Sequence, residues 1–377
     1  MPQASQKPKV ESLKPTSSNA FTATSRFIRQ TIHDLLPKNK WLRRALITFF
    51  ITCMVVLTGM YGLARWYIWS ERNTPETIGV SFIPEYAAYL GVDPKETLDA
   101  LLNDLHVKHL RLTSYWDTIE ATKGSYDFTQ LDWEFQKAEA AHAKITLSVG
   151  LRQPRWPECH VPSWVDTTQP TTNWQPQLEA FISAVVKRYK TSPALQSYQL
   201  ENEYFLKVFG ICQNFSRERL VNEAALVKKL DPSHTLIISR SNNALGWPIG
   251  APTPDEYGIS IYRRVWSPLA KRYLQYPFPA WYYGFLAGWT KLATGKDSMA
   301  HELQAEPWPP HGQNIPETSL EEQSKSFNAE RLKDTVEFGR ATGMKTMDLW
   351  GAEYWYYRKV VLKDPSVWNE AKNIFNQ

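Results

Sequence analysis

Two glutamates end two strand-like runs of this chain, about a hundred residues apart. The first run, SYQLENEYF at residues 197–205, has the composition of a β-strand and delivers Glu203 at its carboxyl end. The second run, SMAHELQAEPW at residues 298–308, delivers Glu306. Two carboxyl groups that face each other can divide acid–base chemistry between them. A protonated carboxyl group donates a proton, while an ionised one attacks carbon or stabilises a developing positive charge.

The segments around these two runs alternate between strand-like and helix-like patterns from about Thr77 onward. A helix start is clear at residues 93–96, DPKE, where Asp, Pro and Glu occupy the N-cap, the first helical position and the capping-box position. A single helix is expected over residues 320–342. The expected strands cover residues 78–83, 107–113, 144–150, 197–205, 234–240, 257–262, a seventh run from 298, and 344–350.

Eight strands alternating with helices predict a (β/α)8 TIM barrel. A doubly wound sheet would have fewer strands and a glycine-rich first turn, and the sequence contains neither G-x-G-x-x-G nor a P-loop string. The long connection at residues 263–297 contains an apolar segment, which we interpret as helix six of the barrel; a flap that faces a membrane or covers substrate is the alternative.

In such a barrel the carboxyl ends of the strands converge on one rim. Strands four and seven lie across the mouth from each other, so Glu203 and Glu306 are expected to approach each other in space. Cleavage of a glycosidic bond requires two carboxyl groups in this arrangement. The sequence also contains sixteen Trp and 13% aromatic residues, and flat apolar rings are the surfaces on which sugars stack.

The pair Asn202-Glu203, together with Glu306, resembles the strand-four and strand-seven motifs of retaining glycoside hydrolases of the (β/α)8 clan A, the cellulase-like and β-galactosidase-like group. The matching set covers nearly all of residues 77–377. The chain departs from the pattern at Tyr204, where many members have proline. The other matching pieces are Arg111, the run YWDTIEATKGSYDFTQLD at residues 115–132, Tyr262 and Trp350.

The resemblance implies Glu203 as the acid/base and Glu306 as the nucleophile, with Arg111 beside Glu306 and Tyr262 donating to it. Asn202 would bind the sugar 2-hydroxyl. Three tryptophans are expected at the sugar: Trp350 under the ring that is cleaved, and Trp308 and Trp156 as platforms.

Three further glutamates remain open at this point. Glu201 should face the same side as Glu203, either as a structural acid or as a buried partner of another charge. Glu302 flanks the same region as Glu306, and Glu353 either lines the cleft or lies in solvent.

The amino-terminal part of the chain has a different character. Residues 1–44 carry nine Lys/Arg against two acids and few large apolar residues, which predicts a disordered, basic, cytoplasmic tail. Residues 45–68 begin with twenty uncharged residues, long enough to cross a bilayer as a signal-anchor helix, and Trp66, Tyr67 and Trp69 follow as an aromatic belt. A short linker at 69–76 would lead into the catalytic domain at 77–377, outside the cytoplasm. A cleaved signal peptide is the competing interpretation.

The expected partners are a carbohydrate substrate and a lipid bilayer, the latter through residues 45–68. Because the basic excess belongs to the tail, a nucleic-acid-binding body is not expected. No cofactor or metal is expected, since the histidines lack metal-ligand spacing. Cys159 and Cys212 follow neighbouring strands and are expected to form a disulfide outside the cytoplasm.

Two other functions stay open. A carbohydrate-binding pseudoenzyme would keep the aromatic cleft without turnover. A barrel of unrelated chemistry, such as a metal-dependent hydrolase, would need ligand sets that the sequence does not show.

Overall fold

The computed structural model describes residues 39–204, 206, 209–212, 215–242, 250–312 and 314–376. The chain divides into two compact units, Met1–Gly59 and Met60–Gln377. Helix α2, Lys40–Ser70, runs through the boundary between them and is long and apolar enough to cross a membrane. It includes the last residues of the predicted basic tail; residues 1–38 of that tail lie outside the described residues.

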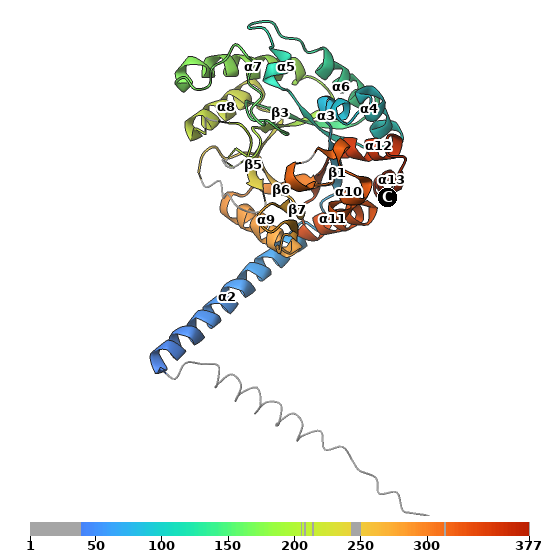
Figure 1. The fold of residues 1–377 in the computed structure, drawn as a ribbon. Helices are drawn as coiled ribbons and strands as arrows, with labels where there is room; N and C mark the ends of the chain where they lie inside the picture. Colours follow the sequence, from blue (N-terminus) through green and yellow to red (C-terminus); the bar gives the residue numbers. More distant parts are fainter. Residues whose placement is uncertain are drawn as a thin grey trace, which may run out of the picture. The chain divides into compact units, whose positions relative to one another are not determined.

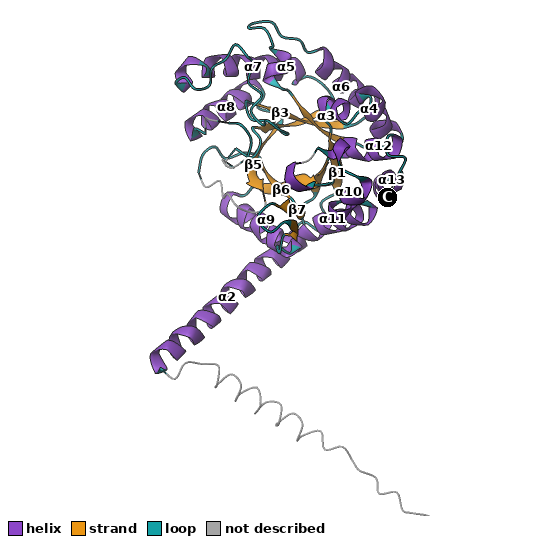
Figure 2. Ribbon diagram, viewed as in Figure 1, coloured by secondary structure: helices purple, strands orange, loops and turns teal. Residues whose placement is uncertain are grey.

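The second unit contains a closed barrel of eight parallel strands, so the predicted (β/α)8 fold is confirmed (Figures 1 and 2). Most of the strand residues are buried on both faces, as parallel barrel strands are. In order around the barrel, the strands are β1 (Thr77–Ser81), β10 (Thr346–Trp350), β9 (Asp297–Gln304), β6 (Glu256–Ile261), β5 (Thr235–Asn242), β4 (Leu195–Leu200), β3 (Lys144–Val149) and β2 (His109–Thr113).

Helices surround the strands in a ring (Figure 2). Helix α4 starts as the sequence predicts, with the Asp93 carboxylate accepting from the backbone N–H groups of Lys95 and Glu96. The helices of this ring are α3 (Pro84–Tyr89), α4 (Pro94–Asn103), α5 (Trp116–Ile119), α6 (Thr129–Ala140), α7 (Gln175–Tyr189), α8 (Arg217–Leu230), α9 (Ala280–Thr294), α10 (Leu320–Ser326), α11 (Ala329–Thr342), α12 (Ala352–Val360) and α13 (Ser366–Phe375).

Two features of this ring differ from the prediction. The single helix expected over 320–342 is two helices, α10 and α11, because Phe327 is extended and the Asn328 side chain caps a new start by accepting from the N–H of Arg331. The connection after β6 forms a hairpin, β7 (Arg264–Ser267) and β8 (Arg272–Gln275), before it continues as α9.

The compact unit that contains the barrel begins at Met60, and the start of the catalytic domain at residue 77 stays a prediction. The end of α2 packs on α9, where Ala64 and Tyr67 are fully buried. Gly288 of α9 permits this close approach, since a Cβ there would lie 3.0 Å from Cβ of Tyr67. Of the predicted aromatic belt, Tyr67 therefore belongs to the barrel core, whereas Trp69 is 59% exposed.

Candidate active site

A cavity of about 830 Å³ opens among the residues that follow the carboxyl ends of the barrel strands. Four carboxylates line it, from Glu158, Glu203, Glu302 and Glu306. Its other lining is rich in aromatic rings, as a sugar-binding cleft would be. The lining includes four of the predicted aromatic residues, Trp156, Tyr262, Trp308 and Trp350.

Glu302 lies on β9 and is held by one donor from β2 and one from the residue that follows β6. Nη1 of Arg111, on β2, lies 3.0 Å from Oε1 of Glu302, and the hydroxyl of Tyr262 donates to Oε2 at 2.8 Å. Tyr262 reaches it because β6 pairs with β9 in a register that sets Ser260 opposite Glu302. Glu302 is buried, and the two donors fix its position and balance a negative charge on it.

These contacts correct two predictions. Arg111 and Tyr262 were both expected to contact Glu306, but their hydrogen bonds go to Glu302. The physical reason is the end of the strand: β9 extends only to Gln304, so Glu302 is a strand residue and Glu306 follows two residues beyond. The two glutamates are therefore held by different groups, and both line the cavity.

Glu306 forms a second charged pair on the cavity wall. Both of its carboxylate oxygens accept from Arg155 at 3.2 Å, and Nε1 of Trp350 donates to Oε1 at 2.9 Å. The Arg155 guanidinium lies 3.3 Å from the ring centroid of Tyr86 and 4.5 Å from that of Trp350. Gly351 is needed here because its φ is +104° and a Cβ at this position would clash with Glu306.

Glu203 differs from the other three cavity carboxyl groups in its ion pairs, although burial raises the pKa of Glu158 as well. Among the described residues, Glu158, Glu302 and Glu306 each form an ion pair with an arginine, and Glu203 forms none. Burial, and after it the nearby charge of Glu302, raise the pKa of Glu203 to about 8. A hydrogen bond from Ser260 and the positive charges of Arg152 and Arg111 lower this pKa but do not offset the rise. Its Oε1 is buried and without a partner among the described residues.

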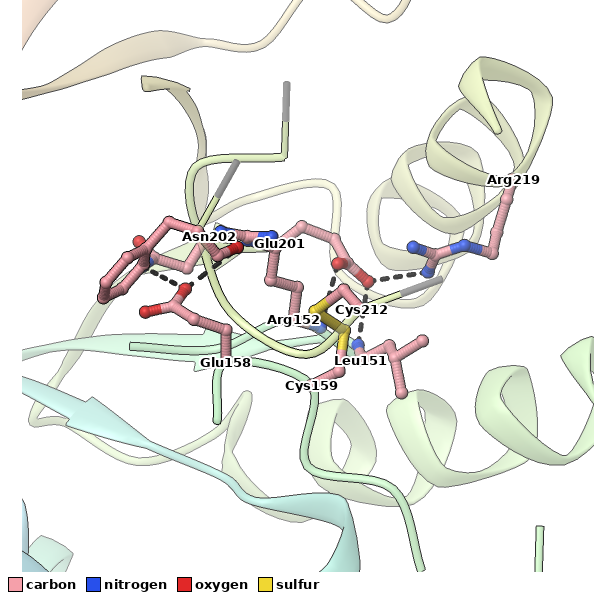
Figure 3. The surroundings of a disulfide bond; sticks show 9 residues. Leu151, Arg152, Glu158, Cys159, Glu201, Asn202, Cys212 and Arg219 are labelled. Carbon is pink, nitrogen blue, oxygen red and sulfur yellow. Dashed lines mark hydrogen bonds and ion pairs between the residues drawn. A yellow bond between two sulfur atoms is a disulfide. The ribbon is translucent and has the colours of Figure 1, made fainter. Parts of the chain in front are cut away.

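Glu201 takes a different direction from Glu203, although strand periodicity predicts the same side. The chain leaves β4 after Leu200, and both glutamates have positive φ, +55° and +41°, so the two-residue period ends there. The Glu201 carboxylate accepts from Arg219 of α8 at 2.7 Å and from the N–H groups of Leu151 and Arg152 (Figure 3). These contacts agree with the structural role that was one of its two interpretations.

Asn202 lies between Arg111 and Glu158. Its Oδ1 accepts from Nη2 of Arg111 at 3.0 Å and from Gln199 at 3.1 Å. Its Nδ2 donates to Oε2 of Glu158 at 3.1 Å (Figure 3). Asn202 and Arg111 are not among the cavity-lining residues, so the binding of a sugar hydroxyl by Asn202 stays a prediction.

The remaining aromatic and acidic residues near the barrel rim fall into two groups, those that line the cavity and those that are buried away from it. Trp156 is 59% exposed at the cavity, and the Trp308 ring contacts that of Tyr262. Trp355 is part of the core, with its Nε1 donating to the carbonyl of Ala305. Glu353 is buried and accepts from the N–H of Ile83. It is therefore neither exposed to solvent nor part of the cavity lining.

Cys159 and Cys212 form a disulfide with a Cα–Cα distance of 5.4 Å, in agreement with the predicted pairing (Figure 3). It joins the loops that follow β3 and β4. Within the described ranges no group of three or more His, Cys, Asp or Glu side chains could hold a metal ion.

Sequence reasoning missed Arg155 and Glu158 and did not assign a role to Glu302. Glu302 could have been found, since it lies inside the seventh strand-like run, four residues before Glu306. Arg155 and Glu158 lie in the loop after β3 and both have positive φ, +79° and +73°. That backbone conformation, which orients their side chains, leaves no periodic signal in the sequence.

No family model and no curated protein matches this sequence. Three solved structures share the barrel fold. GH5_18 of Bifidobacterium longum subsp. longum matches with a TM-score of 0.54 and 13% identity, over 81% of this chain and 79% of that one. A β-galactosidase of the psychrophilic Marinomonas ef1 matches with a TM-score of 0.51 and 12% identity, over 80% and 59%.

The third, an exo-β-1,4-mannosidase of an Opitutaceae bacterium, matches with a TM-score of 0.50 and 15% identity, over 73% of this chain and 51% of that one. This chain therefore spans about half the length of the mannosidase chain. At these identities the likeness shows a common (β/α)8 fold, and the residues of the cavity must carry any argument about chemistry.

Proposed function

We propose that this chain is a membrane-anchored retaining glycoside hydrolase in which Glu302 is the nucleophile and Glu203 the acid/base. The observation that carries the proposal is that Glu302 and Glu203 differ in their hydrogen-bond and charge partners. Arg111 and Tyr262 hold Glu302, whereas Glu203 has no ion pair among the described residues and a pKa raised to about 8. One carboxyl group is thus suited to attack and the other to donate a proton.

The proposed reaction has two steps. In the first, a Glu302 oxygen attacks the anomeric carbon while Glu203 gives its proton to the departing glycosidic oxygen, so that the C–O bond breaks and a glycosyl ester forms. In the second, Glu203 takes a proton from water, the water oxygen attacks the anomeric carbon, and the ester bond to Glu302 breaks. Protons and bonds balance over the two steps, and no cofactor is needed.

The aromatic lining supports a carbohydrate substrate. Trp156, Trp308 and Trp350 offer ring faces or edges to the cavity, and two proteins of similar fold are named a β-galactosidase and an exo-β-1,4-mannosidase. Glu306 is assigned the role of a wall residue in place of nucleophile, since it lies beyond the end of β9 and its ion pair is with Arg155 of the loop after β3.

The amino-terminal segment supports an anchored location. Helix α2 is long and apolar enough to span a bilayer, and the basic residues before it favour a cytoplasmic amino terminus. The barrel would then lie outside the cytoplasm, where a Cys159–Cys212 disulfide persists.

A panel of aryl glycosides tests the catalytic proposal, with the full chain in detergent and the variants Glu302→Gln and Glu306→Gln. Glu302→Gln is expected to lower kcat by at least about 1,000-fold, and Glu306→Gln by far less, because only the first removes a reacting atom. A larger loss of kcat for Glu306→Gln than for Glu302→Gln would instead identify Glu306 as the nucleophile. No turnover of any glycoside by the unaltered chain, with sugar binding retained, would favour the pseudoenzyme.

A further inference from the structure

Helix α9 presents an apolar face away from the barrel. Trp281, Phe285, Trp289 and Leu292 are spaced by four, four and three residues, so they share one side of the helix. Trp289 is 47% exposed and Leu292 59%, while the other two are partly exposed. A helix that covers a water-soluble barrel normally carries charged residues on this side, and an exposed apolar face marks contact with a partner or a membrane.

The charge content of α9 points to lipid as the partner. Its only charged residue is Lys291, which is already bound by Glu71 and Asp297. The outward face therefore offers aromatic and aliphatic groups, with no acidic residue that anionic lipids would repel. Tryptophan in particular is enriched where protein meets the headgroup region of a bilayer.

The last part of α2 contacts both ends of α9. The ring of Tyr61 contacts that of Trp281 at a centroid distance of 5.7 Å, near the amino end of α9. Glu71, which follows α2, pairs with Lys291 in the last turn of α9. The barrel unit, which starts at Met60 within the proposed anchor, therefore begins beside the amino end of α9.

The cavity mouth belongs to the same side of the barrel unit. Tyr276 lines the cavity and precedes Trp281 by five residues, which limits their Cα separation to about 18 Å. The β7–β8 hairpin contributes Trp266 and Pro268 to the lining, and the next residue, Leu269 at its tip, is 96% exposed. A large apolar side chain this exposed at a cavity rim is a second sign of lipid contact.

We propose that the outward face of α9 and the tip of the β7–β8 hairpin rest on the outer surface of the bilayer, so that the cavity opens beside the lipid headgroups. The substrate class is then a glycan held at the membrane surface. This inference rests on the proposed function, both on its membrane anchor and on its glycoside chemistry.

The experiment measures depth with a fluorescent label in the full chain reconstituted into phosphatidylcholine vesicles. Single cysteines carry the environment-sensitive NBD group: the native Cys53 of the apolar segment, and Leu292→Cys, Leu269→Cys or Lys187→Cys in a Cys53→Ser background. The labelling is done without reductant, so the Cys159–Cys212 disulfide stays closed. Lys187 is the matched control, exposed on α7, which lies apart from α9 in Figure 1.

Doxyl-labelled lipids then report the distance of each label from the bilayer. We expect quenching at Cys53, Leu292 and Leu269 that exceeds quenching at Lys187 by at least about two-fold. Quenching at Cys53 with none above control at Leu292 and Leu269 would overturn the inference and leave the anchor standing. Absence of quenching at Cys53 would overturn the anchor, and the inference with it. Quenching at Leu292 but not at Leu269 would contradict the membrane-facing cavity. None of these results depends on activity, so each is separable from the catalytic proposal.

Discussion

Replacing the proposed acid/base by its amide should stabilise the protein at neutral pH while strongly lowering its activity. The pKa of Glu203 is raised to about 8 in the folded chain from an ordinary value of 4.5. A carboxyl group with a raised pKa holds its proton more tightly in the folded state than in the unfolded state. The group therefore does not reduce the free energy of unfolding below about pH 4.5. It reduces this free energy progressively as the pH rises from 4.5 toward 8.

The size of the effect follows from these two pKa values. At pH 7 the unfolded carboxyl group is almost fully ionised and the folded one is not, which costs about 3 kcal/mol; at pH 5 the cost is about 1 kcal/mol. Glu203→Gln removes the titration. Any effect of the amide that does not depend on pH is the same at both pH values and cancels in their difference. The substitution should therefore increase the free energy of unfolding by about 2 kcal/mol more at pH 7 than at pH 5.

Urea unfolding of the full chain in detergent at pH 5 and pH 7 measures this difference. Glu201→Gln is the matched control, two residues away. Its carboxylate accepts from Arg219 and two backbone N–H groups, so the same substitution should destabilise by about 3–5 kcal/mol. A change in stability for Glu203→Gln that is equal at the two pH values would refute the assignment of a buried, protonated Glu203.

Three further predictions follow from the contacts at the site. Tyr262→Phe removes one donor to the Glu302 carboxylate and should lower kcat/KM by about 10- to 100-fold with the fold intact, which steady-state kinetics and circular dichroism would check; an unchanged kcat/KM would contradict the role of Tyr262. The kcat/KM of the unaltered chain should fall above about pH 8, as Glu203 loses its proton, and this alkaline limb should be absent from the residual activity of Glu203→Gln; a limb that persists there belongs to another group. The double variant Cys159→Ser/Cys212→Ser opens a crosslink between residues separated by 53 positions and should lower the free energy of unfolding by about 4 kcal/mol in urea titrations, a value near zero being the contrary result.

The barrel could be predicted from the sequence because its signals are periodic. Buried parallel strands read as short apolar runs, and capping residues such as Asp93 mark helix starts through hydrogen bonds that the structure shows. The same reasoning merged α10 and α11, because only two extended residues, Phe327 and Asn328, separate them, and the apolar Phe327 fits a helical stripe. It also could not show the burial of Tyr67, which depends on α9, more than two hundred residues further along.

The sequence could predict which residues lie at the site, but not which glutamate each of them contacts. Arg111, Tyr262 and Trp350 are all close to the carboxylates, and the strand count alone places them at one rim. Which glutamate each would contact depends on where β9 ends, and element boundaries are the weakest part of a sequence prediction. The loop after β3, which supplies Arg155 and Glu158, is oriented by positive φ angles that the sequence pattern does not encode.

The most direct test of the account is to trap the glycosyl ester and identify the residue that carries it. The full chain would be treated with 2-deoxy-2-fluoro glycosides of several sugars, because fluorine at C2 slows the second step and lets the ester accumulate. Peptide mapping of the labelled protein by mass spectrometry then locates the sugar. The account predicts a label on Glu302, within the β9 peptide, and none on Glu302→Gln. A label on Glu306 would contradict the central claim.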